Sequence, residues 1–406
     1  MKKRLLFVVV LFLALGTTLT VIKAIGQGKP TVEERCITVP FKLYFNEIFF
    51  QASINGSNPL WVILDSGLSG FIVNEKSAEK LKLPMGNIID QGYTGIGENR
   101  VFEKELKDIK FRIYNAELLL NSHLYAYSFE TLEKILGHRV DAVCGRQLFE
   151  KYVIEIDYSK RVFKLYNQDK YKYKGKGSII PIIIDKVPYL KSTVVLPDNK
   201  KIEEIFMIDT GLPDAISFTS KFCKDNNLDK QIKTIKSVRF GAGGSSVNHN
   251  GRIKEVIIGG YKIDNPIVSL SNNTRGGMAR SDIGGLIGNE ILKRFIVIFD
   301  YANSRMILEP TSSIGDKMEW DMAGVFLYTI ENLDQIKVFK VLSDSPADLA
   351  GIKEGDEITF IDDVKASNYS IDEISRMFKI ENKQYRLGIV RGQKNFEVKI
   401  NLKKMI

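Results

Sequence analysis

Short apolar runs separated by turn residues dominate the chain up to about residue 310. Two long runs rich in Ile, Val, Phe, Tyr and Thr cover residues 41–54 and 179–196, and Asn-Gly and Pro-Asp-Asn turn sequences follow them. Such runs predict β-strands. Helical patterns are short, at 75–82 and 290–295, and a polar, lysine-rich stretch at 167–177 interrupts the β pattern. The sequence therefore predicts a mainly β protein with a junction within that stretch.

Three landmarks occur twice in this β region, in the same order. They are an apolar strand that ends in Asp-Ser-Gly or Asp-Thr-Gly, an apolar pair before a glycine, and an apolar strand that ends in Asp-Tyr. Because all three keep one offset to within a single residue, the pattern indicates two homologous lobes. The pairs are Asp65 and Asp209, Gly145 and Gly288, and Asp157 and Asp300, with separations of 144, 143 and 143 residues.

Each triplet follows four apolar residues, which places each aspartate at the end of a buried strand. The glycines permit a tight turn, and the hydroxyl residues can hydrogen-bond across a seam between two facing turns. These loop-supporting residues are Ser66, Gly67, Thr210 and Gly211.

If the two lobes pack about a pseudo-twofold axis, Asp65 and Asp209 meet. Two carboxyls that close share one proton, so the ionised member can take a proton from water while the protonated one polarises a carbonyl. This chemistry requires no cofactor and no metal. The alternative is that each triplet is an ordinary turn at the end of a strand.

Other chemistries have weak support in the sequence. The three histidines and three cysteines are scattered, without the spacing of a zinc site, a CxxC motif or a GxSxG elbow. The formal net charge is +9, but the basic residues are dispersed, so we expect no nucleic-acid partner. Paired carboxylates remain as the expected chemistry.

Residues 36–310 resemble two-lobed aspartyl proteases of the pepsin and retropepsin type, closest to the bacterial retropepsin-like group. The segments Val143-Cys144-Gly145 and Leu286-Ile287-Gly288 match the hydrophobic-hydrophobic-Gly supports of that family. The resemblance implies catalytic residues Asp65 and Asp209, peptide or protein substrates, and glycine-rich flap hairpins over the site. The matching flap residues are Gly92, Tyr93 and Gly95 in the first lobe and Gly241 and Gly243 in the second.

The triplets depart from the family pattern at the next position. Leu68 and Leu212 stand where relatives carry Ser, Thr or Ala, and Pro213 follows the second triplet. An apolar neighbour removes a hydrogen bond that would stabilise the ionised carboxylate, so we expect a pH optimum nearer neutral than strongly acidic. Pro213 argues against strict symmetry between the lobes. Tyr93 is expected to touch substrate, with an ordinary hairpin as the alternative.

A different pattern begins after residue 313. Residues 345–358 resemble the PDZ signature S-P-A-x-x-A-G-(I/L)-x-x-G-D-x-I, and residues 370–378 predict a capped amphipathic helix. In PDZ domains a peptide C-terminus adds as a strand beside such a helix, with its carboxylate held by backbone amides. The expected peptide-binding residues are Gly324, Val325 and Phe326. The alternative is a PDZ fold that serves only as a packing or regulatory module.

The N-terminus begins with Lys2-Lys3-Arg4 and continues with an apolar run. This order predicts a signal peptide, or an uncleaved anchor that would attach the protein to the membrane. The sequence thus predicts an exported or envelope aspartic endopeptidase, with a non-catalytic peptide-binding envelope protein as the alternative. The expected domains are an export segment over 1–28, lobes over 36–167 and 178–311, and a PDZ domain over 320–406.

Overall fold

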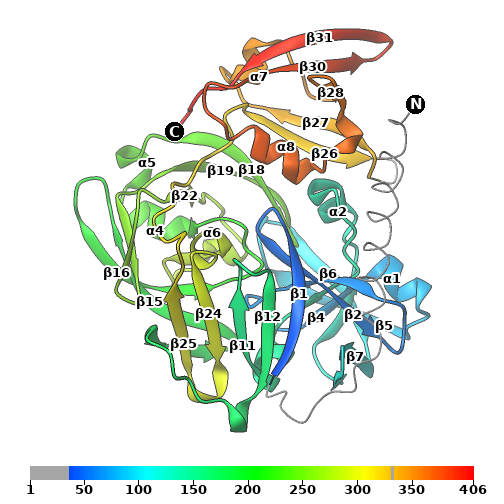
Figure 1. The fold of residues 1–406 in the computed structure, drawn as a ribbon, viewed down its shortest axis with the longest axis vertical. Helices are drawn as coiled ribbons and strands as arrows, with labels where there is room; N and C mark the ends of the chain where they lie inside the picture. The colour runs from blue at the N-terminus through cyan, green and yellow to red at the C-terminus, as the bar shows by residue number, and fades with distance from the viewer. Residues whose placement is uncertain (1–35, 331–332) are drawn as a thin grey trace, which may run out of the picture. The chain divides into compact units, whose positions relative to one another are not determined.

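Strands are the commonest element of the described residues, as the apolar runs predicted. The computed structural model describes residues 36–330 and 333–406 (Figure 1). Within these residues the strands form three sheets of 15, 10 and 6 members. Residues 37–406 belong to one compact unit.

The first half of the β region begins with a β-hairpin. The apolar run at 41–54 is two strands, because Phe45 and Asn46 both take positive φ angles, 48° and 67°, and turn the chain back on itself. The elements are β1 (Cys36–Tyr44), β2 (Glu47–Ile54), β3 (Leu60–Leu64), β4 (Phe71–Asn74), α1 (Glu75–Lys80), β5 (Met85–Tyr93), β6 (Arg100–Leu106), β7 (Ile109–Ile113), β8 (Ala116–Leu120), β9 (Leu124–Tyr127), α2 (Glu130–Leu136), β10 (Ala142–Cys144), α3 (Arg146–Lys151), β11 (Tyr152–Asp157), β12 (Val162–Asn167) and η1 (Gln168–Lys170).

The second half repeats much of this order. The helix expected at 290–295 ends earlier, because Phe295 already belongs to a buried strand of the sheet. The elements are β13 (Ser178–Pro181), β14 (Ile183–Asp185), β15 (Val187–Val195), β16 (Lys201–Ile208), β17 (Ile216–Phe218), α4 (Ser220–Asp225), α5 (Leu228–Gln231), β18 (Ile235–Gly241), β19 (Gly244–Arg252), β20 (Glu255–Ile258), β21 (Tyr261–Asp264), β22 (Ile267–Leu270), η2 (Gly277–Ala279), β23 (Gly285–Ile287), α6 (Asn289–Leu292), β24 (Phe295–Asp300), η3 (Tyr301–Asn303) and β25 (Arg305–Pro310).

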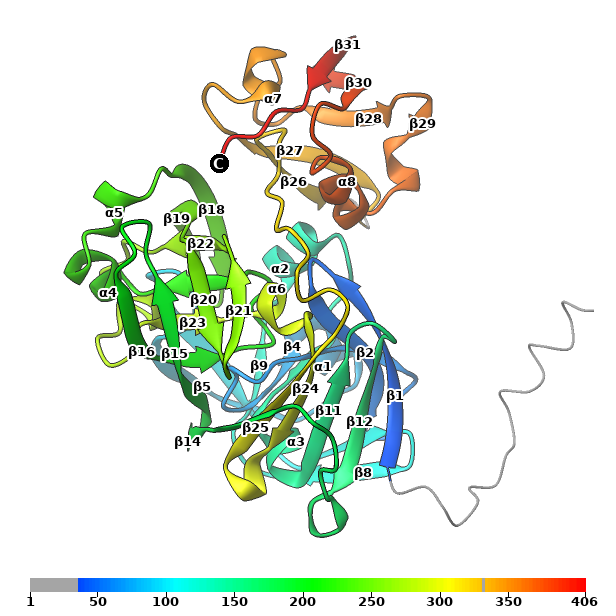
Figure 2. The ribbon, with the colours of Figure 1, turned by 60° about the vertical axis from the view of Figure 1, so that its left-hand side comes forward.

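The two halves are joined by strand pairing as well as by the chain. Strand β11 of the first half pairs antiparallel with β24 of the second, with Ile154 opposite Phe299 (Figure 2). A single hydrophobic cluster contains buried residues of both halves, such as Phe50 and Phe206. The halves therefore share one core.

The last part of the chain forms its own six-stranded sheet and its own hydrophobic cluster. The expected amphipathic helix is confirmed as α8, with a capping box between Ser370 and Glu373 and with Ile371, Ile374 and Phe378 buried. The elements are β26 (Val325–Ile330), β27 (Gln335–Val341), α7 (Pro346–Leu349), β28 (Glu357–Ile361), β29 (Val364–Lys365), η4 (Ala366–Asn368), α8 (Ile371–Met377), β30 (Gln384–Arg391) and β31 (Lys394–Asn401).

The expected signal peptide or membrane anchor at residues 1–28 lies outside the described residues. Across residues 36–330 and 333–406, no helix combines the length and apolar character that a membrane crossing requires.

Candidate functional site

Both Asp-Ser/Thr-Gly triplets follow a strand that is supported in the same way. β3 pairs in parallel with β10, so Asp65 N donates to Cys144 O at 3.0 Å. β16 pairs in parallel with β23, so Asp209 N donates to Ile287 O at 2.9 Å. The expected apolar-apolar-Gly segments therefore lie against the triplets. The pairing of these buried strands fixes the backbone position of each aspartate.

The two triplets face each other and exchange hydrogen bonds. Ser66 N donates to Thr210 Oγ1 at 2.8 Å, and Thr210 N donates to Ser66 Oγ at 3.0 Å. Each hydroxyl also donates to the opposite strand, Ser66 Oγ to Ile208 O and Thr210 Oγ1 to Leu64 O, at 2.8 and 2.9 Å. Both side chains are almost completely buried. This reciprocal set of four bonds holds the loops in register.

The glycines let the two aspartates approach. A Cβ atom added to Gly67 would lie 2.6 Å from Asp209 Cγ, and one added to Gly211 would lie 2.5 Å from Asp65 Cγ. Each glycine N–H also donates to the aspartate of its own triplet at 2.8 Å. The structure thus brings the two predicted catalytic residues together, with room between them only because both neighbours are glycines.

Burial raises the pKa of both carboxyls above the ordinary aspartate value. The charge of Asp209 and a hydrogen bond to it raise the pKa of Asp65 further, while the bond from Gly67 opposes this shift. The hydrogen bond between the two side chains raises the pKa of Asp65 and lowers that of Asp209, which is the direction expected of two carboxyls that share one proton. Such a pair can donate one proton and accept another without a metal or cofactor. Among the described residues, no group of three His, Cys, Asp or Glu side chains is arranged to hold a metal ion.

A third carboxyl near this pair was not anticipated from the sequence. Phe49 on β2 lies opposite Ile63 on β3, so extending the pairing by two residues places Glu47 opposite Asp65. The same extension in the second half places Val187 opposite Asp209. Glu47 is 8% exposed, and burial, followed by the charge of Asp209, raises its pKa to about 8. The sequence does show an acid, Glu47, where the other half has the apolar Val187. Only the strand register, however, shows that these two positions are equivalent and that Glu47 lies beside the aspartates.

Replacing Glu47 with Gln is expected to flatten the pH dependence of stability. Because the folded-state pKa of Glu47 is raised, from 4.5 to about 8, its stabilising contribution is complete below pH 4.5 and is lost as the pH rises through 8. The wild type should lose about 3 kcal/mol more than Glu47→Gln in free energy of unfolding between pH 5 and pH 8. Urea unfolding at both pH values measures this difference. Exposed Glu203→Gln is the control, and a pH dependence equal in wild type and Glu47→Gln would contradict the assignment.

Two hairpins meet at their tips beside this site. β5–β6 and β18–β19 form a bridge between Gly97 and Gly243, and Gly243 N donates to Ile96 O at 2.9 Å. Ile96 packs against the buried cluster that contains Leu212, next to the second triplet. Three predicted flap residues, Gly95, Gly241 and Gly243, therefore lie where the tips join.

The other two predicted flap residues lie further along the first hairpin. Tyr93 is 40% exposed, and its Oη accepts a hydrogen bond from Arg275 at 3.0 Å. The guanidinium groups of Arg100 and Arg275 also lie against its ring, 5.5 and 5.2 Å from the ring centre. Gly92 has open space around its α-carbon. Contact of Tyr93 with a substrate stays a prediction.

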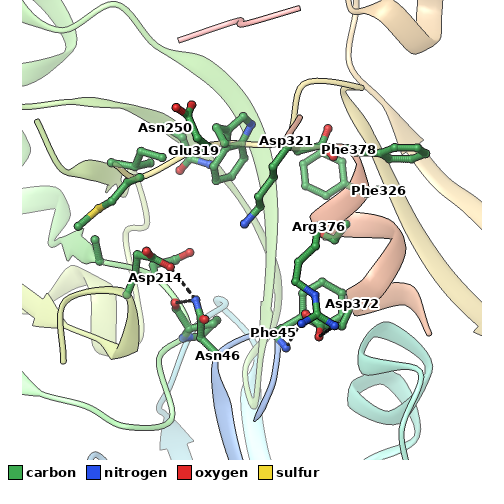
Figure 3. Close-up of a pocket in the computed structure, with 18 of the residues that line it drawn as sticks. Phe45, Asn46, Asp214, Asn250, Glu319, Asp321, Phe326, Asp372, Arg376 and Phe378 are labelled. Carbon is green, nitrogen blue, oxygen red and sulfur yellow. Dashed lines mark hydrogen bonds and ion pairs between the residues drawn. The ribbon is translucent and has the colours of Figure 1, made fainter. Parts of the chain in front are cut away.

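A cavity of about 570 Å³ has one wall formed by β26 and α8 (Figure 3). The expected peptide-binding residues Val325 and Phe326 line it, and Gly324 precedes them with φ of +72°. The turn between β1 and β2 lies on the opposite wall and is hydrogen-bonded both to α8 and to the second half. Phe45 N donates to Asp372 Oδ1 at 3.1 Å, and Asn46 Nδ2 donates to Pro213 O at 3.0 Å.

Comparison with known proteins identifies one part of the chain. The PDZ domain family matches residues 324–390. The chain thus carries a PDZ domain, whose β26 and α8 form the cavity wall described above. No curated protein matches the chain. The aspartyl protease resemblance of residues 36–310 and the pseudo-twofold relation of the lobes stay predictions.

Proposed function

We propose that residues 36–310 form an aspartic endopeptidase in which Asp65 and Asp209 activate a water molecule. The observation that carries the proposal is the reciprocal bonding of Ser66 and Thr210, which holds two partly buried carboxyls close enough to share a proton. A rigidly held pair of carboxyls with raised pKa values suits general acid–base catalysis on a neutral group such as a peptide bond. The joined hairpin tips beside the pair support a role in covering an extended chain.

Each proton in the proposed reaction has a defined destination. Asp209 takes a proton from the water molecule while the oxygen of that water attacks the peptide carbonyl carbon. At the same time Asp65 gives its proton to the carbonyl oxygen. The resulting tetrahedral diol breaks its C–N bond when the nitrogen receives the proton from Asp209. Asp65 recovers its proton from the diol, so the pair returns to its starting state with water consumed.

The PDZ domain indicates binding of protein or peptide partners. We propose that it recruits substrates or regulates the lobes through peptide C-termini. The basic N-terminal start and the apolar run after it support export to the cell envelope, where exported or envelope proteins would be the substrates.

Cleavage of an unstructured protein between pH 3 and pH 8 tests the proposal. We expect hydrolysis with an optimum nearer neutral than acidic, because burial raises the pKa of both aspartates and keeps their shared proton at higher pH. Product masses give the cut sites. An optimum near pH 3 would contradict the pH prediction alone. A folded wild type without activity at every pH would instead favour a non-catalytic peptide-binding protein.

A further inference from the structure

The loop that begins the PDZ groove is already bound by a carboxylate of this chain. Asp321 directly precedes Met322, and its Oδ1 accepts hydrogen bonds from Ala323 N at 3.0 Å and Gly324 N at 2.6 Å. The backbone N–H of Val325 also interacts favourably with the ionised side chain. Two successive amides therefore bind one oxygen of a carboxylate that lines the cavity together with Phe326 (Figure 3).

The same amides lie where the end of an added strand would begin. β26 is the edge strand of its sheet, since the strand order starts with β26 and its described partner strand is β27. A peptide added beside β26, on the side of α8, would bring its terminal carboxylate to the loop before Val325. Backbone amides in such a loop capture a chain-end carboxylate. Two carboxylates cannot occupy these donors at once.

We propose that Asp321 is an internal competitor for the terminal carboxylate of a peptide, and that it keeps the PDZ groove closed until it releases the amides of Ala323 and Gly324. This inference rests on the proposed peptide-binding role of the PDZ domain.

The groove walls define the peptide that would enter. Val325 and Leu327 are two residues apart on β26, so they share one face, and Ile371 lines the cavity from α8. Because alternate side chains of an added strand point the same way, apolar residues fit at the last and third-last positions of the peptide. The occupant is therefore a free C-terminus with apolar side chains at these two positions.

The competition depends on pH. Burial raises the pKa of Asp321 to about 7, while the amides and the charge of Lys379 oppose the shift. Above pH 7 the ionised side chain is a strong acceptor for the amides. Below pH 7 the side chain is protonated and is a weak acceptor, whereas the terminal carboxylate of a peptide remains ionised. The charged groups on the segments packed around the loop are Lys317, Glu319, Asp344, Asp348, Lys379, Lys403 and Lys404.

Binding to an array of free-carboxylate heptapeptides tests the inference. The peptides vary the last and third-last residues, and the protein is the full chain carrying Asp65→Asn, so that the probe is not cut. We expect affinity to rise about tenfold from pH 8 to pH 6, as the protonated fraction of Asp321 rises. With Asp321→Ala added, binding at pH 8 should equal binding at pH 6. Asp321→Asn, which keeps the side-chain oxygen but not the charge, should also lose the pH dependence.

The outcomes separate this inference from the function on which it rests. Equal affinity of the wild-type groove at pH 6 and pH 8, or no gain for Asp321→Ala at pH 8, would overturn the competitor role while leaving peptide binding in place. A folded Asp321→Ala protein that binds no peptide at either pH would overturn both. Asp363→Ala, on an exposed turn of the same domain, is the control and should behave as the wild type.

Discussion

Asp65→Asn is expected to abolish peptide hydrolysis, with a loss in kcat of at least about a thousandfold. The amide has nearly the same shape as the carboxyl, so the bonds between Ser66 and Thr210 should remain. It cannot, however, hold the proton that the pair shares. Asp209→Asn should be as inactive, and the double variant no worse than either, because the two carboxyls act as one unit.

Mass spectrometry of the products from one unstructured substrate measures all three variants at the pH optimum of the wild type. Asp198→Asn, in an exposed turn of the second half, serves as the matched control and should retain full activity. Turnover that survives either Asp65→Asn or Asp209→Asn would show that the pair is not the catalytic centre.

Thr210→Val is expected to lower the free energy of unfolding by about 3 kcal/mol. Valine matches threonine in shape, but it removes the acceptor for Ser66 N and the donor to Leu64 O. Both backbone groups then stay buried without their partner, and each such group costs about 1–3 kcal/mol. Urea unfolding at pH 6 gives the difference.

Two variants make the Thr210 result specific. Thr210→Ser keeps the hydroxyl and should recover most of the stability, since only a methyl group is lost. Thr193→Val, on the partly exposed face of β15, should change stability by less than about 0.5 kcal/mol. A Thr210→Val protein as stable as the wild type would mean that the bonds across the seam contribute nothing to folding.

The repeat in the sequence located the two aspartates because short-range signals define them. An apolar strand, a carboxylate and a glycine turn lie within seven residues, so their meeting required only that the two copies pack face to face. The extent of the helix near Glu290 was wrong, because the pairing of β24 with its neighbours overrides the local helical pattern. Glu47 and Asp321 were missed for a related reason. Strand register places Glu47 opposite Asp65, and the path of one loop turns two amides toward Asp321.

The pairing of β11 with β24 makes each half of the β region depend on the other for its sheet. β13, which follows the lysine-rich junction, pairs with β25 and thereby joins the same sheet as β12, which precedes the junction. The halves are thus held by a continuous ladder of backbone hydrogen bonds and a common core. The covalent link at residues 168–177 raises the effective concentration of one half for the other, but it is not the interface itself. The complete site, with one aspartate from each half, therefore depends on a folding unit larger than either copy of the repeat.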